Sequence, residues 1–576
     1  MENARFDLGD LQDLSKSQRL RGYELKSIEQ HPFLAASYAH PEAYFQALHE
    51  QFIANGYYSQ TVIQERYSLY WDLIEAKVGH RVPAISIYQE DLNWQHFSYD
   101  ALHKRVGELS AKWAAAGVGY GSSVTLLASV GFEFVIGLLT GLKLGATLSW
   151  VAPHGPTFIK NRLSRLDSEF IAANPRHYPE LEGQRLDFDR LAAGESLPVP
   201  PSVHYEPDSP VLKLLSPLAS LRDTPVELTA ADLYHRLLND SLIVLELNGG
   251  DRVSLPGMDA AQCQPWALLT TLLAGGTFMH VTPETLTKTP QAWTDYQPTV
   301  LGLDDETRKL VVKHQDSIAP SLRLWMRDIS EPLDWRAWES FQQGFGERRP
   351  WGLNLLVNAA FGGVILFSPR ADRVPPIHVT PAPGLNWSLQ DQAGPGETRR
   401  RATGLYGSPD SGLTEDHHGQ ILLSQAKPGE IYYIGNPEGI AGARTYPSHE
   451  VSTLVSNLPD VSDCTVLQLD RLIDVPGTAV NLLVFLNRAL RPHFTVQEKA
   501  QLSSTIKALI KQELGEAFVP TEVTLTHAYP ERADGALDLS WTQSQFYRGI
   551  FEIKEDISIF STLAALRALV DESKDA

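Results

Sequence analysis

Between residues 82 and 151, short apolar runs alternate with segments whose apolar residues share one helical face. Within the first such segment these residues recur at spacings of four, three and four, at Leu102, Val106, Leu109 and Trp113. Strands are expected on either side, at 82–87 and 123–129, and a second helix at 132–144 ends at a glycine. A β-α-β-α order of this kind predicts a parallel sheet covered by helices, which makes the fold class α/β.

The chain has 576 residues, which is too long for one hydrophobic core. We expect an N-terminal helical arm at 1–60 and a large α/β body at 61–434. The body is expected to include a small β subdomain in the Gly- and Pro-rich segment 377–424. A small C-terminal α/β domain at 435–549 and a helix or tail at 550–576 complete the predicted organisation. Within the large body, apolar runs also predict a strand at 241–247, and 283–312 suits a helix-turn-helix connection.

The net charge of −20 disfavours a nucleic-acid or anionic-membrane partner, because phosphate binding needs clustered Lys and Arg. The chain has two cysteines and no signal-peptide pattern, so a cytoplasmic location is expected. The apolar segment 124–151 contains Glu133 and Lys143, which indicates a strand and a buried helix rather than a membrane span. The adjacent His417 and His418 would point to opposite faces of a strand, so no metal site is predicted there.

Residues 214–229 consist of an apolar run, a loop of small and hydroxyl-bearing residues, a second apolar run and a helix start. The hydroxyls of the loop belong to Ser216, Ser220 and Thr224. This layout resembles the nucleotide-binding loop of the acyl-adenylate-forming superfamily, which contains acyl-CoA synthetases, nonribosomal adenylation domains and luciferases. The family loop is rich in Ser, Thr and Gly and ends in Pro-Lys-Gly, so that backbone N–H groups and hydroxyls surround a phosphate. In this chain Leu218 and Leu221 replace two glycines, and Thr224 stands at the lysine.

Further segments resemble the family in the same order along the chain. Phe361-Gly362 corresponds to the Tyr-Gly of the family's Tyr-Gly-x-Thr-Glu loop, whose aromatic residue packs near adenine. Ile365 stands at the glutamate, which in active relatives helps to hold Mg²⁺, and an isoleucine offers no oxygen ligand. Asp410 aligns with the family aspartate that binds the ribose hydroxyls. The predicted nucleotide-binding positions are therefore Ser216, Ser220, Thr224, Phe361, Gly362 and Asp410.

Two further family positions are also changed. Asp259 matches the histidine of a Pro-x-Phe-His stretch. Ala536 matches the lysine of the C-terminal catalytic loop, and the nearest cation before it is Arg532. The resemblance spans residues 80–549 and implies the two-domain adenylate-forming fold. Because adenylation depends on positioning and on charge stabilisation, the replaced residues predict that this activity is lost.

Three functions remain open on this basis. The first is an accessory protein of a biosynthetic pathway, a pseudoenzyme that binds an acyl or aryl ligand or a carrier protein, with no catalytic residue and no cofactor. The second is an active acyl- or aryl-acid ligase that uses ATP and Mg²⁺ through displaced cations, with Lys213, Arg222 or Arg444 replacing the lysines. The third is a hydrolase or transferase, for which no Gly-x-Ser-x-Gly motif is present. Whether the chain is an enzyme therefore stays open.

Overall fold

The structure is a computed structural model, and its description covers most of the chain. The described residues are 19–20, 32–56, 66–89, 93–174, 178, 184–189, 197–215, 225–331, 333–391, 399–405, 419–427, 430–435, 446–469, 479–487, 494–533, 536–538, 541–542 and 545–546. The chain divides into two compact units. The first comprises residues 1–153, 159–437 and 441–445, and the second comprises 154–158, 438–440 and 446–576. In the described part of the chain, no helix is long and apolar enough to cross a membrane.

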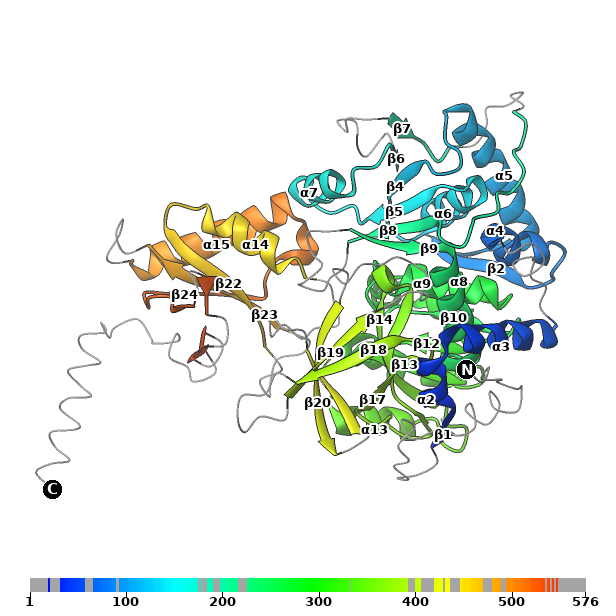
Figure 1. The fold of residues 1–576 in the computed structure, drawn as a ribbon. Coiled ribbons are helices and arrows are strands. Elements are labelled where there is room, and N and C mark those ends of the chain that lie inside the picture. Colours follow the sequence, from blue (N-terminus) through cyan, green and yellow to red (C-terminus); the bar gives the residue numbers. More distant parts are fainter. Residues whose placement is uncertain are drawn as a thin grey trace, which may run out of the picture. The chain divides into compact units, whose positions relative to one another are not determined.

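The first sheet of the large unit is mainly parallel (Figure 1). Its strands pair in the order β7 (Gln184–Leu186), β6 (Phe170–Ala173), β4 (Ser123–Leu127), β5 (Thr147–Val151), β8 (Pro210–Leu214) and β9 (Val226–Thr229). All neighbours in this order run parallel except β8 and β9. Helix α6 (Phe132–Leu144) connects β4 to β5, α7 (Pro156–Leu166) connects β5 to β6, and α5 (Tyr99–Ala115) leads into β4 from the second sheet. The predicted parallel sheet with helical connections is confirmed from residue 123 onward, whereas the strand predicted at 82–87 pairs in the second sheet.

Local sequence signals determine the ends of α5 and α6. The Ser98 side chain accepts a hydrogen bond from the Ala101 N–H at 3.1 Å and so caps the start of α5. The apolar face predicted for this helix is buried, with Leu102, Val106, Leu109 and Trp113 each at most 1% exposed. Gly145 ends α6 in the left-handed conformation with φ +80°, as glycine commonly does after a helix.

The second sheet of this unit is parallel in its middle and antiparallel at both ends. Its strands pair in the order β3 (Asn93–Ser98), β2 (Pro83–Gln89), β11 (Thr277–His280), β10 (Arg252–Ser254), β12 (Val300–Gly302), β13 (Leu324–Asp328), β14 (Trp351–Asn358), β15 (Gly363–Phe367) and β17 (His378–Pro381). Helices near its strands are α8 (Ala230–Asn239), α9 (Gln264–Leu273), α10 (Pro283–Lys288), α11 (Asp305–Lys313), α12 (Gln315–Ile318) and α13 (Trp335–Gln343). Apolar side chains from both sheets form one continuous core.

Two local predictions are wrong in this region. Residues 240–244 form a single π-helical turn that continues α8, where a strand was expected at 241–247. A short apolar run does not distinguish a strand from a buried helical segment, and here the Ser241 hydroxyl donates to the Leu237 carbonyl at 2.6 Å. The segment 283–312, expected to be a helix-turn-helix connection, contains the strand β12 between α10 and α11.

An antiparallel β subdomain extends the second sheet from β17. Its strands continue in the order β21 (Glu430–Gly435), β20 (Gly419–Lys427), β19 (Arg399–Leu405) and β18 (Asn386–Asp391). All of these pairs are antiparallel. The β subdomain predicted from the Gly- and Pro-rich sequence is thus confirmed.

Two helices precede the first sheet in the sequence, α2 (Pro32–Ala39) and α3 (Pro41–Ala54). Proline stands at the first position of α3, where its missing N–H has no intrahelical role. Tyr44 of α3 is fully buried, and its hydroxyl donates to the Asn239 side-chain oxygen at 2.7 Å. The helical arm predicted from the sequence therefore packs against α8 and contributes to the core of the large unit.

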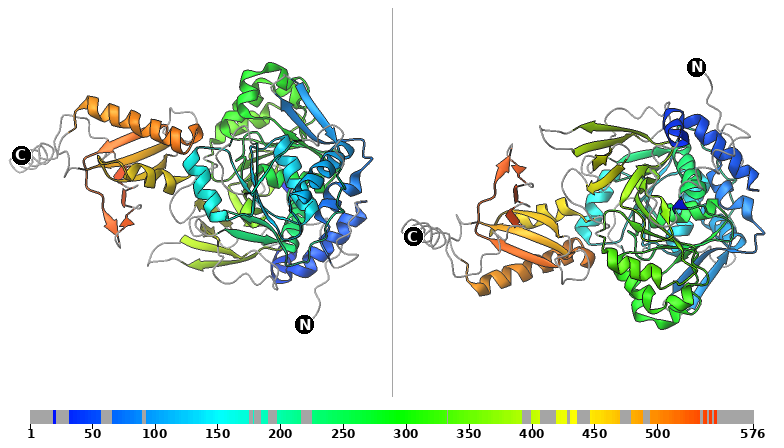
Figure 2. Two further views of the ribbon diagram at one scale, coloured as in Figure 1. Left: turned by 90° about the horizontal axis from the view of Figure 1, so that it is seen from above. Right: turned by 90° about the horizontal axis from the view of Figure 1, so that it is seen from below.

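The second unit contains a small mixed sheet covered by helices. Its strands pair in the order β22 (Val461–Leu469), β23 (Ala479–Leu486) and β24 (Glu522–Thr526). The helices α14 (Ser448–Ser456) and α15 (Val496–Glu513) lie on one face of this sheet (Figure 1 and Figure 2). A capping box starts α15, in which Thr495 and Glu498 satisfy each other's backbone N–H groups. A short antiparallel ribbon, β25 (Arg532–Ala533) and β26 (Ala536–Leu537), follows.

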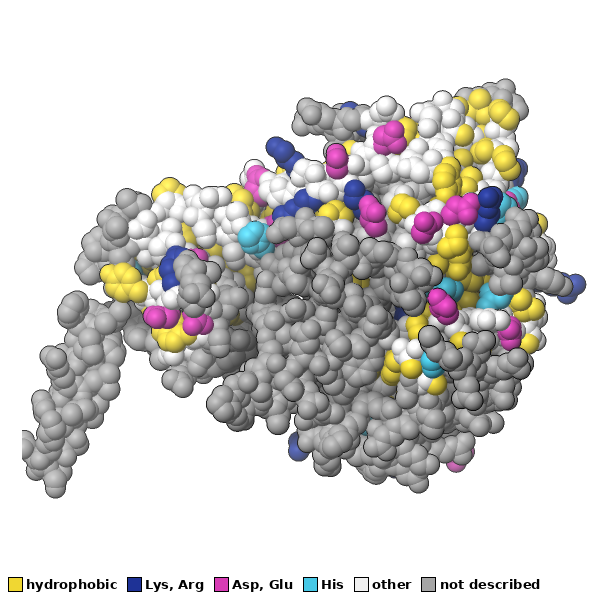
Figure 3. Space-filling view, in the orientation of Figure 1, with side chains coloured by type: hydrophobic (Ala, Val, Ile, Leu, Met, Phe, Trp, Pro, Cys, Tyr) yellow, Lys and Arg dark blue, Asp and Glu magenta, His cyan; other side chains and the backbone are white. Residues whose placement is uncertain are grey.

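Charged side chains of both signs are mixed on the molecular face that Figure 3 shows. Among the described residues of that face, Lys and Arg do not gather into a continuous stripe.

Candidate functional site

The turn between β14 and β15 contains Phe361 and Gly362, two of the predicted nucleotide-binding positions. The Asn358 side chain at the end of β14 accepts a hydrogen bond from the Ala360 N–H at 3.0 Å and starts a 3₁₀ turn over Ala359–Phe361. Gly362 then adopts a left-handed conformation with φ +79°. The Phe361 side chain is 2% exposed, so it packs inside the large unit.

The residue that follows this turn on β15 has no room for a side chain. A Cβ atom added to Gly363 would lie 2.2 Å from the Asp240 Oδ2 atom and 3.1 Å from the Trp266 Nε1 atom. Glycine at this position therefore allows a buried carboxylate to approach the strand backbone.

Asp240 is that buried carboxylate, and sequence reasoning did not single it out. Its Oδ2 atom accepts hydrogen bonds from the Trp266 Nε1–H at 2.8 Å and from the Val364 N–H at 2.9 Å. Its Oδ1 atom accepts one from the Asn239 side-chain amide at 2.9 Å. Burial raises the pKa of Asp240 to about 6, although the Val364 N–H and Arg236 partly stabilise its charged form. The polar triplet Asn239-Asp240-Ser241 inside an apolar run was the available signal.

Ile365 lies two residues beyond Gly363 on β15, and its side chain is 3% exposed. Its neighbour Val364 is completely buried, and both belong to the main apolar core. A hydrocarbon side chain in such surroundings has no oxygen to offer a hard cation. The residue at this position therefore does not fit a Mg²⁺ ion.

Acidic side chains lie at the carboxyl ends of strands in the second sheet. Asp328 ends β13, is 7% exposed, and accepts hydrogen bonds from the Ser330 N–H at 2.8 Å and from its hydroxyl at 2.5 Å. Burial raises the pKa of Asp328 to about 6, while the Ser330 hydrogen bonds and the positive charge of Arg327 oppose this shift and Asp259 adds a smaller upward contribution. Burial, followed by the charges of Asp328 and Asp259, also raises the pKa of the Cys263 thiol well above its ordinary value. Burial is thus the main reason that these groups favour their uncharged forms.

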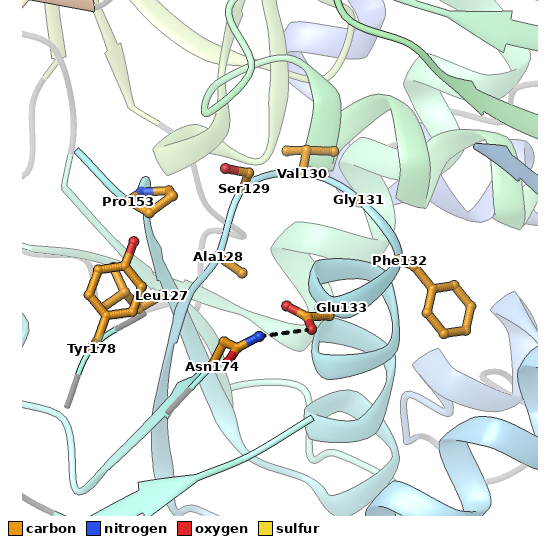
Figure 4. A pocket seen from close by; sticks show the side chains of 10 residues that line it. All are labelled: Leu127, Ala128, Ser129, Val130, Gly131, Phe132, Glu133, Pro153, Asn174 and Tyr178. Carbon is orange, nitrogen blue, oxygen red and sulfur yellow. Dashed lines mark hydrogen bonds between the residues drawn. The ribbon is translucent and has the colours of Figure 1, made fainter. Parts of the chain in front are cut away.

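A cavity lies at the carboxyl ends of strands in the first sheet (Figure 4). Its volume is about 290 Å³. It is lined by Leu127, Ala128, Ser129, Val130, Gly131, Phe132, Glu133, Pro153, Asn174 and Tyr178. These residues come from the exit of β4 and the start of α6, from the exit of β5 and from the exit of β6.

Comparison with solved structures shows where this architecture occurs. The acetoacetyl-CoA synthetase from Streptomyces lividans aligns over 92% of this chain and 93% of its own, with TM-score 0.56 and 15% identity. The o-succinylbenzoate CoA synthetase from Bacillus subtilis aligns over 82% and 98%, with TM-score 0.62 and 12% identity. The amide bond synthetase from Marinactinospora thermotolerans aligns over 83% and 99%, with TM-score 0.62 and 14% identity. The chain has the adenylate-forming fold.

At these identities the likeness establishes the fold, and the fold predicted from the sequence is thereby confirmed. No protein-family model matches the chain, and no curated protein matches it either. The roles of individual residues in this adenylate-forming fold therefore rest on their geometry and chemistry.

The segment that resembles the family's C-terminal catalytic loop includes the ribbon of β25 and β26. Ala536, which the sequence comparison matches to the family lysine, pairs with Ala533 across this ribbon. Arg532, the nearest preceding cation, forms an ion pair with Asp463 of β22, with 2.6 Å between its Nη2 atom and Asp463 Oδ2. Its guanidinium is therefore engaged within the second unit. Sequence reasoning did not find this pair, because the two residues are 69 positions apart in the chain.

Several predicted positions of the adenylate-forming site lie outside the described residues. These are Ser216, Ser220, Thr224 and Asp410, the two loop leucines Leu218 and Leu221, and the displaced cations Arg222 and Arg444. His417 and His418, where no metal site was predicted, also lie outside the described residues. Lys213, the third displaced cation, lies on β8 directly across from Glu227 of β9. In the described part of the chain, no group of three or more His, Cys, Asp or Glu residues is arranged to hold a metal ion.

Proposed function

We propose that this chain binds an acyl or aryl ligand, or a carrier protein that bears one, and does not form an acyl-adenylate. It would act as a binding subunit in a biosynthetic pathway, with an adenylate-forming fold and no ATP chemistry. The observation that carries this proposal is the burial of Ile365 in the apolar core, at the position where active relatives hold Mg²⁺. Without an oxygen ligand there, charge on a transferring phosphate is not neutralised by a metal held at this position.

Two further observations support the proposal. Ala536 supplies no charge at the lysine position, and the nearby Arg532 is already paired with Asp463.

The ligand class rests on the structural neighbours. The o-succinylbenzoate CoA synthetase was solved with a product analogue, OSB-NCoA, bound to it. We extend to this chain only the general class, an acyl or aryl group carried by a thiol.

The alternative is an active ligase that uses displaced cations. Lys213 favours it, because this residue lies on β8 directly before the loop that resembles the phosphate loop. Isotopic pyrophosphate exchange with ATP, Mg²⁺ and a panel of aliphatic and aryl acids separates the two functions. The proposal expects no exchange above background and saturable binding of an acyl or aryl thioester by calorimetry. Clear exchange with any acid would establish the ligase instead.

A further inference from the structure

The cavity of the first sheet lies where the direction of the chain across the sheet reverses. From β4 the chain passes through α6 to β5 on one side, and then returns past β4 to β6 on its other side. In open α/β sheets, ligands bind outside the carboxyl ends of the strands at such a reversal. The cavity is lined by the exits of β4, β5 and β6, which are the strands that define the reversal.

The charge of the cavity wall argues against an anionic ligand. Glu133 stands in the first turn of α6, so its carboxylate already complements the positive end of the helix dipole. Among the described lining residues, Glu133 is the single acidic side chain, and neither Lys nor Arg is present. A phosphate or carboxylate placed in the cavity would therefore meet a negative charge without a compensating cation from these residues.

The polar groups of the wall suit a hydrogen-bond donor. Glu133 and Asn174 point toward each other across the cavity, and the Asn174 Nδ2 atom lies 3.5 Å from Glu133 Oε1 (Figure 4). A contact of this length is weak, so it orients the carboxylate and still permits a stronger donor to bind. Apolar parts of the wall come from Leu127, Ala128, Pro153 and the Tyr178 ring (Figure 4).

We propose that this cavity is a binding site for a small organic amine. The ammonium group binds the Glu133 carboxylate, and the apolar part of the ligand packs between Leu127, Pro153 and the Tyr178 ring. A volume of about 290 Å³ fits a compact ligand with one ring, at the lower end of known ligand pockets. The site is separate from the turn between β14 and β15 and does not depend on the absence of adenylation.

The test is calorimetric titration of the full-length protein with 2-phenylethylamine, and in parallel with 3-phenylpropanoate and coenzyme A. Saturable amine binding is expected, together with weaker binding of both anions. The Glu133→Gln variant should lose about two- to fivefold in amine affinity, as expected for the loss of an exposed charge pair. Glu169→Gln is the matched control, because Glu169 is an exposed glutamate at the opposite end of β6.

Three results would overturn the proposal. These are no amine binding at millimolar concentration, equal loss of affinity in both variants, or tighter binding of either anion that Glu133→Gln further strengthens. The amine titration does not measure pyrophosphate exchange, so a negative result for amine binding leaves the proposed function unaffected. Likewise, pyrophosphate exchange by this protein would contradict the proposed function and leave the amine site unaffected.

Discussion

The carboxylate of Asp240 accepts a hydrogen bond from the backbone N–H of Val364 at 2.9 Å, although the two residues are 124 positions apart in the chain. The same oxygen accepts from the Trp266 indole, and Asn239 links the group to Tyr44 of the N-terminal arm. One buried acid thus connects α3, α8, α9 and the turn that contains Phe361 and Gly362. The shape of the candidate site depends on this contact.

The first prediction concerns the pH dependence that Asp240 imposes on stability. Its pKa of about 6 in the folded protein lies above the ordinary 3.8, so the folded state retains a proton that the unfolded state releases. Stability contributed by this group is therefore complete below about pH 4 and is lost as pH rises to about 6. A shift of roughly two units corresponds to about 3 kcal/mol.

The variant Asp240→Asn should reduce this pH dependence, because it has no proton to release. Denaturant unfolding at pH 4, 5, 6 and 7 measures the slope for the transition of the large unit. Asp295→Asn, which removes an exposed carboxylate, serves as the control. An unchanged slope in Asp240→Asn would show that this carboxyl group titrates at its ordinary pKa.

The second prediction is that Gly363→Ala destabilises the large unit. The added methyl group would lie 2.2 Å from Asp240 Oδ2, so the carboxylate must move away from the Val364 N–H. Overpacking of this kind costs about 1–3 kcal/mol, and a weakened buried hydrogen bond adds to it. Gly119→Ala is the matched control, since a Cβ there meets no atom within 4 Å. Equal unfolding midpoints for the two variants would contradict the contact.

The sequence was sufficient for the elements whose local signals agree. The helix Phe132–Leu144 was predicted to the residue, because an apolar periodicity and a terminal glycine give the same answer. The buried face of α5 followed from spacing alone. By contrast, residues 240–244 were assigned to a strand, since a short apolar run is compatible with both structures and the tertiary contacts of Asp240 decide between them.

The features of the candidate site also fall into those that the sequence predicts and those that depend on tertiary contacts. The order of its motifs, compared with a known family, predicts that Ile365, Asp259 and Ala536 replace chemically active residues, and this assignment stays a prediction. The proximity of Asp328 to Asp259 and the pairing of Arg532 with Asp463 were not predictable, because both depend on residues brought together from distant parts of the chain. The Asp240 carboxylate was missed for the same reason.

The third prediction is that Mg²⁺ does not promote ATP binding. The Ile365 side chain is 3% exposed within hydrocarbon surroundings and cannot replace an oxygen ligand. Calorimetric titration with ATP should give no micromolar dissociation constant, and the heats should be the same with Mg²⁺ and with a chelator. A micromolar constant that requires Mg²⁺ would contradict this expectation and would favour the ligase.

The fourth prediction is that Ala536→Lys alone does not create acyl-adenylate formation. The substitution places an ammonium group on the ribbon of β25 and β26, but the oxygen ligand missing at Ile365 is not restored. Because catalysis of this kind depends on several charges acting together, one restored cation should leave pyrophosphate exchange at background. The measurement is isotopic exchange across aliphatic and aryl acids for the unmodified protein and for Ala536→Lys.

Two further variants make this experiment decisive. Arg532→Ala removes the cation nearest to Ala536, which in the structure is paired with Asp463. Lys213→Ala removes the cation that lies across from Glu227 on β9. If the unmodified protein catalyses exchange and either substitution abolishes it, displaced cations perform the chemistry and the chain is a ligase. The opposite result is that pyrophosphate exchange stays at background in the unmodified protein and in all three variants, while each still binds the thioester. Ligand binding without adenylation is then the function that remains, because the binding site is intact and one added lysine does not restore catalysis.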